Sequence, residues 1–224
     1  MKLIIYDKWK KSRNEDFVQF LEHDSNSKVI DLGCGYGDFT IKIKEKIGCN
    51  EIFGVDIYES DIHRAKNKGI EVIKYNLSKF PYPFIDNSFD VVLSNQLIEH
   101  LFYPVRFIQE INRILKPNGY CVISTENLAS WDNVCALILG YTPFSMEFDS
   151  GLYKIGNPLS PHKKEMFECR NPHIRIFTLK GLIELLRSSG FKIKKVVGNS
   201  HILFKLGEIL DKRHCRFITI KASK

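Results

Sequence analysis

The segment VIDLGCGYGDFT, residues 29–40, joins a short apolar run to a turn that holds three glycines within five residues. Glycine lacks a Cβ atom and tolerates positive φ, so such a turn lets the backbone approach a ligand closely. The spacing Gly33-x-Gly35-x-Gly37 is one residue shorter than the dinucleotide-binding pattern G-x-G-x-x-G, and no lysine followed by Ser or Thr completes a P-loop. The turn therefore predicts a ligand site between a buried strand and a helix, but neither of these two nucleotide motifs.

Strand and helix signals alternate on both sides of this turn. The strand signals lie at 28–33, 51–57, 70–77, 89–95, 120–125, 191–198 and 216–223, and the helical signals lie at 38–48, 59–69, 104–119, 130–140 and 179–190. The last helix has Thr178 as a good N-cap and Gly190 as its stop. Because parallel strands are joined by right-handed helical crossovers, this order predicts an α/β fold with a doubly wound, Rossmann-like sheet.

The length of 224 residues and the composition are those of one sizeable globular domain. We therefore predict a single domain over residues 1–224. The segment 126–177 breaks the rhythm of strands and helices, and its many aromatic residues argue against disorder. Long irregular segments inside a compact domain are usually functional, so this insertion is a candidate for a functional region.

Hydropathy and cysteine spacing predict a cytoplasmic protein with free thiols. No apolar run is long enough to span a bilayer, and the N-terminal residues lack the apolar core and cleavage site of a signal peptide. The six cysteines show none of the spacings of zinc ligands, so we expect neither a disulfide framework nor a metal site.

The net charge of +7 is unevenly distributed along the chain. Residues 1–127 carry 17 Lys and Arg against 18 Asp and Glu, a net charge of −1, whereas residues 128–224 carry 16 against 8, a net charge of +8. A basic half can attract a phosphate-bearing substrate, a nucleic acid or an anionic membrane surface. A solvated, lysine-rich face explains the same pattern.

Four motifs in residues 28–125 together resemble those of the class I S-adenosylmethionine-dependent methyltransferases of the type 11 or UbiE-like group. Asp31 and the three glycines match the motif of an acid followed by G-x-G-x-G, and Asp56 matches the acid that ends the second strand. FPYPFIDNSFDVVLSNQLIEHL (80–101) is similar to the proline-rich loop, fourth strand and EHL of the family. INRILKPNGYCVIST (111–125) is similar to its R-x-L-K-P-G-G helix and fifth strand. The resemblance implies a mostly parallel sheet of seven strands, an antiparallel last strand and helices on both faces.

The resemblance also implies S-adenosyl-L-methionine as the cofactor and S-adenosyl-L-homocysteine as the product. Asp56 would hold the ribose hydroxyls, because a carboxylate accepts two hydrogen bonds at once, and Ile57 would pack on the adenine. Asn95, at the end of the fourth strand, would approach the methionine end. The implied cofactor-binding residues are Asp31, Gly33, Gly35, Gly37, Asp56, Ile57, Asn76, Leu77 and Asn95.

Two positions depart from the family pattern. Asn76 stands where most members have an aspartate that accepts from the adenine amino group, and its amide oxygen can accept the same hydrogen bond. Asn118 replaces the first glycine of K-P-G-G, and asparagine also tolerates a left-handed conformation.

The reaction implied by the resemblance is transfer of a methyl group by in-line displacement to an O or N atom of a small-molecule, lipid or glycan-type acceptor. His100 is the candidate catalytic base, since imidazole titrates near neutral pH. Its presence in family members with different substrates also suits a structural or cofactor-side role. Glu99 is interpreted as a cap or a structural partner.

The family places substrate choice in two segments, here an N-terminal helical cap at 1–27 and the insertion at about 126–177. Arg175 beside Arg170 suits a carboxylate or phosphate, and a plain salt bridge explains the same pair. The aromatic residues of the insertion either line an apolar pocket or pack the insertion onto the sheet. The substrate candidates are Trp131, Tyr141, His173 and Arg175, followed by Phe144, Met146, Phe148, Tyr153, Met166 and Phe167, with His162 and Glu147 as further polar candidates.

Two other functions stay open. A methyltransferase acting on RNA, such as tRNA, fits the basic C-terminal half, although the sequence SNQL stands where an amino-methylating enzyme would have N/D-P-P-Y/F. A non-catalytic protein of the same fold that binds a partner is the alternative from another class, and the intact glycines and Asp56 argue against it.

Overall fold

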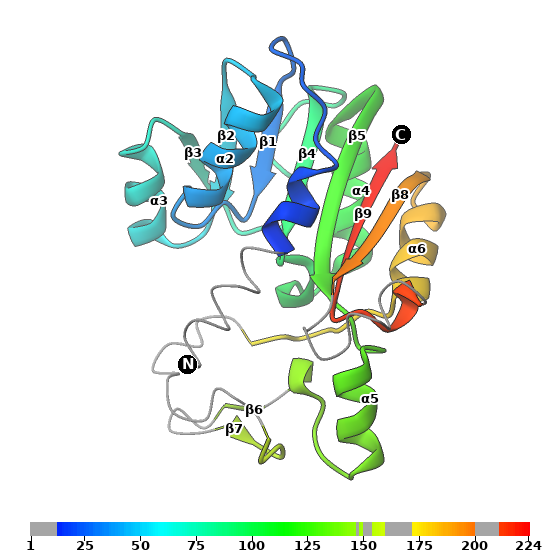
Figure 1. The fold of residues 1–224 in the computed structure, drawn as a ribbon. Coiled ribbons are helices and arrows are strands. Elements are labelled where there is room, and N and C mark those ends of the chain that lie inside the picture. Colours follow the sequence, from blue (N-terminus) through cyan, green and yellow to red (C-terminus); the bar gives the residue numbers. More distant parts are fainter. Residues whose placement is uncertain (1–12, 147, 150–153, 160–171, 200–210) are drawn as a thin grey trace.

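Seven strands form the central sheet in a computed structural model that describes residues 13–146, 148–149, 154–159, 172–199 and 211–224 (Figure 1). Their order across the sheet is β3-β2-β1-β4-β5-β9-β8. The strands are β1 (Val29–Leu32), β2 (Ile52–Asp56), β3 (Glu71–Lys74), β4 (Phe89–Asn95), β5 (Leu115–Glu126), β8 (Lys192–Asn199) and β9 (Phe217–Ser223). β1 to β5 pair in parallel, and β9 is antiparallel to both β5 and β8. The expected mostly parallel sheet with an antiparallel last strand is confirmed.

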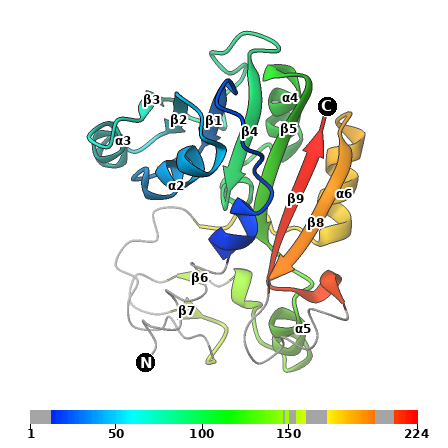
Figure 2. The same cartoon turned by 45° about the horizontal axis from the view of Figure 1, so that its top comes forward.

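Helices cover both faces of this sheet, as the alternating signals predict (Figures 1 and 2). They are α2 (Asp38–Ile47), α3 (Glu59–Lys66), α4 (Pro104–Ile114), α5 (Trp131–Ile138) and α6 (Leu179–Ser188), with the 3-10 turns η1 (Ile98–His100), η2 (Phe144–Met146) and η4 (Lys212–His214). Within the described residues, every helix is too short or too polar to cross a lipid bilayer.

The core lies in two layers, one on each face of the sheet. Side chains alternate between the two faces along a strand, so Val29 of β1 packs with α2, whereas Ile30 and Leu32 pack with α4 and α6. Burial on both faces explains why the strands read as nearly continuous apolar runs. The carboxyl ends of β1, β2, β4 and β5 therefore meet at one edge of a rigid, fully covered sheet.

Part of the predicted N-terminal cap lies against this core. Residues 13–18 are helical, and Phe17, Phe20 and Leu21 are buried in the layer that contains α2. Lys221 of β9 donates to the carbonyl oxygen of Phe20 at 3.0 Å and holds the end of this segment. Residues 1–12 of the cap lie outside the described residues.

Helix α4 ends earlier than the sequence pattern predicts. The pattern continued the helix to Gly119, whereas α4 stops at Ile114 and Leu115 is already extended, with φ −75° and ψ 133°. Pro117 disfavours a helical Lys116 and has no N–H to donate, so the chain enters β5 directly. Asn118 adopts φ +67°, the left-handed conformation expected for the residue that replaces a glycine.

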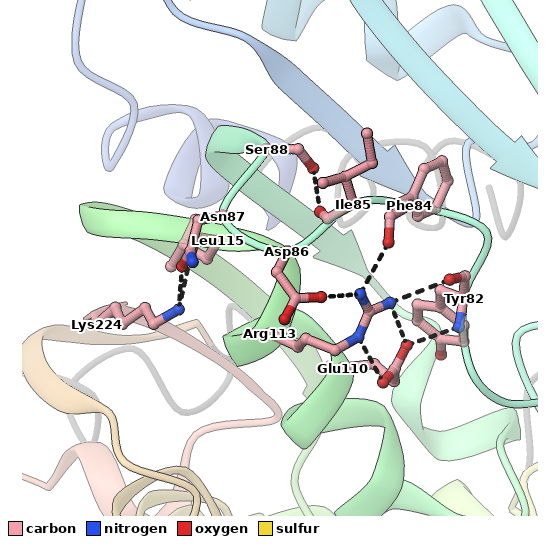
Figure 3. Close-up of polar contacts among 10 residues, drawn as sticks. All are labelled: Tyr82, Phe84, Ile85, Asp86, Asn87, Ser88, Glu110, Arg113, Leu115 and Lys224. Atoms are coloured by element: carbon pink, nitrogen blue, oxygen red, sulfur yellow. Dashed lines mark hydrogen bonds and ion pairs between the residues drawn. The ribbon is translucent and has the colours of Figure 1, made fainter.

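Arg113 of α4 fastens the proline-rich loop that leads into β4 (Figure 3). Its guanidinium donates to the Glu110 carboxylate at 2.9 and 2.8 Å and to Asp86 at 2.6 Å. It also donates to the carbonyl oxygens of Phe84 at 2.8 Å and Tyr82 at 3.0 Å. All five N–H groups are thereby used, and the hydrogen bonds that Arg113 donates to Glu110 and Asp86 raise its pKa above the ordinary value.

The insertion at 126–177 leaves the sheet and returns to it at two residues that pair with each other. Asn127, directly after β5, forms a parallel bridge with Phe177, and Leu128 N–H donates to the Phe177 carbonyl at 2.9 Å. Between these points lie α5, η2 and a small hairpin of β6 (Phe148–Asp149) and β7 (Lys154–Ile155). α5 and this hairpin lie beyond the carboxyl ends of β4 and β5 (Figures 1 and 2).

Candidate functional site

The glycine turn between β1 and α2 forms one wall of the candidate site. Gly33, Gly35 and Gly37 all have positive φ, at +80°, +52° and +78°. Apart from its two chain neighbours, no described residue has an atom within 4 Å of a Cβ built at Gly35, whereas a Cβ at Gly37 would lie 2.5 Å from Cδ1 of Ile70. Gly35 therefore faces open space that a ligand can enter, and Gly37 allows close packing of the turn against the chain after α3.

Four backbone amides of this turn, those of Gly33, Cys34, Gly35 and Gly37, are already used within the protein. Gly33 and Cys34 donate to the carbonyl oxygen of Val55 at 2.8 and 3.1 Å, and Gly35 donates to Oδ2 of Asp56 at 2.8 Å. Phosphate-binding loops instead point their amides at the ligand. The turn thus provides a close approach for a ligand without phosphate groups, which agrees with the exclusion of the nucleotide motifs from the sequence.

Asp56 ends β2 directly beside the turn. Its Oδ1 accepts from the amides of Ile57 at 2.8 Å and Tyr58 at 3.1 Å, and its Oδ2 accepts from Gly35. A carboxylate has about four acceptor positions. Because three are used, one position on Oδ2 remains for a ligand. Ile57 next to it is 44% exposed, an apolar surface at the rim of the site.

Asp31 belongs to β1, directly before the turn, and its side chain is buried. Its side chain is 3% exposed, and Oδ2 accepts from the hydroxyl of Thr40 in α2 at 2.6 Å. Burial raises the pKa of Asp31 to about 6, an effect only partly offset by the hydrogen bond from Thr40. The geometry gives Asp31 the position of a support for the turn, although the sequence predicts it as a cofactor contact.

Asn76 and Leu77 follow β3 at the same edge of the sheet. The side-chain oxygen of Asn76 accepts from the amide of Ser78 at 2.9 Å, which leaves one of its two lone pairs for a ligand. Leu77 is buried in the core, and its carbonyl oxygen accepts from the hydroxyl of Tyr82 at 2.8 Å.

Asn95, the last residue of β4, presents a buried polar atom at the site. Its Nδ2 donates to Oδ1 of Asn14 at 3.4 Å, but no donor among the described residues reaches its own buried Oδ1. Buried polar atoms are nearly always hydrogen bonded, so this oxygen is a place where a donor group of a ligand fits. Gln96 follows with φ +55°, an uncommon conformation for a residue with a side chain.

The structure brings His100 together with His173 and Glu99. The two imidazole centroids are 4.8 Å apart, and a ligand atom of each of the three side chains lies within 4.8 Å of the others. Glu99 is completely buried, and burial raises the pKa of its carboxyl above the ordinary value. Sequence reasoning missed Glu99 as part of this cluster, although its position in EHL directly after β4 marks it as a residue at the edge of the site.

Of the other predicted substrate residues, Arg175 adjoins this cluster, since its amide donates to the carbonyl oxygen of Glu99 at 3.1 Å. The rest lie farther along the insertion or outside the described residues. Trp131 stacks on the imidazole of His214 at 4.4 Å, Tyr141 lines an open pocket of about 350 Å³, and the guanidinium of Arg175 donates to the carbonyl of Phe102 at 3.3 Å. Phe144 belongs to η2, and Met146, also of η2, is partly exposed at the same pocket. The side chain of Phe148, and all of Glu147, Tyr153, His162, Met166, Phe167 and Arg170, lie outside the described residues.

Comparison with known proteins shows which family this chain resembles in sequence. A family model described as a methyltransferase domain matches residues 6–196. A protein of Mycolicibacterium smegmatis named as a probable S-adenosylmethionine-dependent methyltransferase is 29% identical over 84% of this chain and 62% of its own length. A mitochondrial ubiquinone biosynthesis O-methyltransferase of Dictyostelium discoideum is 28% identical over 69% of this chain and 52% of its own length. The chain thus covers less than two thirds of either relative.

A solved structure shows the same fold. The S-adenosylmethionine-dependent methyltransferase from Mesorhizobium loti superimposes with a TM-score of 0.66 at 20% identity, over 94% of this chain and 96% of that one. The overall fold of this chain is therefore shared with that protein.

Proposed function

This chain belongs to the S-adenosylmethionine-dependent methyltransferases, and from that premise we propose that it transfers a methyl group to an O or N atom of a small-molecule, lipid or glycan-type acceptor. S-adenosyl-L-methionine supplies an electrophilic methyl group bound to a positively charged sulfur atom. The protein's task is to hold that group and the acceptor in line and to exclude water, and positioning of this kind contributes much of the rate enhancement.

The described residues fit this cofactor. The open space at Gly35 admits a ligand against bare backbone, and the amides of Gly33, Cys34 and Gly35 are occupied, as suits a cofactor without phosphate. Asp56 has an acceptor position for a ribose hydroxyl, Ile57 offers an apolar surface for adenine, and the buried Oδ1 of Asn95 suits an ammonium donor. Asp31 would act indirectly, through the turn.

The observation that carries the proposal is the pairing of Asp56 with the amide of Gly35. This 2.8 Å hydrogen bond joins the carboxyl ends of β1 and β2 and fixes the carboxylate beside the open side of the turn. Each group alone is common, whereas a carboxylate held against bare backbone at the carboxyl edge of a parallel sheet supports a cofactor site, because ligands of open α/β sheets bind at this edge.

Calorimetry with S-adenosyl-L-homocysteine tests the cofactor site. Asp56→Ala removes the acceptor for the ribose, so we expect the affinity to fall at least about tenfold, the equivalent of one lost hydrogen bond to a charged group. Glu51→Ala is the matched control, because Glu51 is exposed and directly precedes the other end of β2. Equal binding by both variants, or no binding by the wild-type protein, contradicts the proposal.

Transfer of a labelled methyl group distinguishes the acceptor classes. We expect label in a small-molecule extract, as the name of the Dictyostelium relative suggests for that protein. The net charge of +8 in residues 128–224 favours RNA as the second candidate, and label recovered in RNA would establish it. Binding of the cofactor without transfer to either fraction would support the non-catalytic alternative.

A further inference from the structure

The cluster of Glu99, His100 and His173 has the arrangement of a metal-binding site. Glu99 and His100 belong to η1, directly after β4, whereas His173 comes from the far end of the insertion. Ligand atoms of the three side chains lie within 4.8 Å of one another. Two imidazoles and one carboxylate are a common ligand set for divalent transition metals, and as three protein ligands they leave a coordination position open.

Both imidazoles are held by backbone carbonyls through the same nitrogen. Nδ1 of His100 lies 3.2 Å from the carbonyl oxygen of Pro172, and Nδ1 of His173 lies 2.8 Å from that of Ser145. A carbonyl oxygen only accepts, so the proton of each neutral ring is on Nδ1 and the lone pair is on Nε2. Metal-binding histidines typically have this arrangement, which fixes the ring and its tautomer.

The carboxyl of Glu99 supplies a buried oxygen that needs a partner. Oε2 lies 2.8 Å from the hydroxyl of Thr125 in β5, but no hydrogen-bond partner among the described residues reaches the buried Oε1. The whole residue is 0% exposed. A buried carboxylate oxygen without a partner is unfavourable by several kcal/mol at most sites, and a cation removes that cost.

The backbone around the cluster is fixed by further hydrogen bonds. The amides of Ile174 and Arg175 both donate to the carbonyl oxygen of Glu99, at 2.8 and 3.1 Å, so the segment of His173 is tied to η1. The side chain of Asn133 in α5 donates to the hydroxyl of Ser145 at 2.9 Å and positions the carbonyl that holds His173. The ligand set is therefore assembled by elements from three parts of the chain.

The cluster lies at the edge of the sheet that carries the glycine turn. Leu97, next to η1, is the side chain that a Cβ atom at Gly33 would meet, at 3.1 Å. Thr125, the partner of Glu99, lies near the end of β5, beside β4. A cation at the cluster would thus lie on the acceptor side of the candidate cofactor site.

We propose that Glu99, His100 and His173 bind one divalent transition metal ion of the zinc type, through Oε1 of the carboxylate and Nε2 of each imidazole. The proposed role of the ion rests on the proposed function: an acceptor hydroxyl that enters the open coordination position loses its proton to solvent more readily. The ion then orients the acceptor oxygen. The histidines act as ligands in this arrangement and not as the proton acceptor that the sequence predicts for His100.

Metal titration of the untagged full chain tests the site. After treatment with a chelator, we expect the wild-type protein to bind one equivalent of Co²⁺ with the visible absorption bands of an ordered site, and to lose it to Zn²⁺. We expect His173→Gln and Glu99→Gln to weaken binding more than about 100-fold, beyond the 10–100-fold typical of outer residues around a metal. His63→Gln, on the exposed surface of α3, is the matched control with one histidine fewer and should bind like the wild type.

Cofactor calorimetry on the same variants shows whether they are folded. His173→Gln with normal affinity for S-adenosyl-L-homocysteine and lost Co²⁺ binding supports the site. No Co²⁺ binding by the wild type, or equal binding by wild type and both cluster variants, overturns it. Methyl transfer that proceeds equally after chelation overturns the proposed role of the ion and leaves the methyltransferase function intact. Metal binding without methyl transfer to any acceptor supports the metal site and contradicts the proposed function.

Discussion

At the scale of single residues, the three glycines of the turn have different tasks. All three need positive φ, but only Gly35 has open space where a side chain would point. At Gly37 a methyl group would meet Ile70 at 2.5 Å and Ala65 at 3.0 Å. A side chain at Gly35 therefore blocks a ligand, whereas a side chain at Gly37 disturbs packing.

We expect Gly35→Ala to lower the affinity for S-adenosyl-L-homocysteine at least about tenfold. The same change costs about 1–2 kcal/mol of unfolding free energy, because alanine is strained in the left-handed conformation. Gly69→Ala is the matched control, since Gly69 has φ +79° and equal open space but lies after α3. Calorimetry and urea unfolding on both variants measure the two effects, and equal affinities would refute the assignment of Gly35.

We expect Gly37→Ala instead to lower the free energy of unfolding, while the folded molecules keep most of their affinity for S-adenosyl-L-homocysteine. Strain and the close contact with Ile70 together cost about 2–5 kcal/mol. An unfolding free energy close to that of the Gly69→Ala variant would show that Gly37 does not pack as described.

Asp31 gives the protein a pH dependence of known sign. Its pKa is about 6 in the folded protein against 3.8 for an ordinary aspartate, so the folded state binds the extra proton between these values. The contribution to the free energy of unfolding is therefore fully present below about pH 4 and is lost as pH rises through about 6, a change of about 3 kcal/mol. Asp31→Asn removes this change.

Urea unfolding of the wild type and Asp31→Asn from pH 4 to pH 7 measures that difference. We expect the variant to gain stability relative to the wild type as pH rises, and to keep the hydrogen-bonding partner that Thr40 needs. If the unfolding free energies of the two proteins change with pH in parallel, the carboxyl of Asp31 titrates normally in the folded protein.

At the scale of elements, α4 and the loop before β4 depend on one guanidinium. Arg113→Met leaves the carboxylate of Glu110, only 12% exposed, without its cation, so we expect a loss of about 2–3 kcal/mol in unfolding free energy. Lys116→Met breaks the ion pair with Asp90, in which both side chains are more exposed, and should cost less than about 1 kcal/mol. Equal losses in urea unfolding would contradict the role of Arg113.

The elements themselves were largely predictable, because strands buried on both faces and helices with apolar stripes have distinct periods. All seven predicted strands of the sheet are present. The wrong end of α4 shows the limit of periodicity, since the apolar spacing continued past Ile114 while Pro117 ended the helix. A local backbone effect decided the boundary there.

At the scale of the whole molecule, the sequence predicts one side of the site and not the other. The cofactor side is built from local turns at strand ends, so the glycine turn could be located from its spacing, and the resemblance to the family motifs implied Gly35 and Asp56 as cofactor-binding residues. The cluster of Glu99 and His173 depends on how the insertion returns to the sheet, and no sequence period encodes such a contact. Likewise, the stacking of Trp131 on His214 joins α5 to η4, which lie far apart in the sequence, and no local pattern predicts it.

The bridge between Asn127 and Phe177 has a consequence for how such proteins diverge. Because the chain departs and returns at paired residues, the free-energy cost of closing the excursion rises only slowly with its length, by about 0.6 kcal/mol for each doubling. Substitution or lengthening between these two anchors leaves the strand register untouched. Exchange of this one segment between homologues would therefore leave the sheet unchanged, and it would test the expectation that the insertion selects the acceptor.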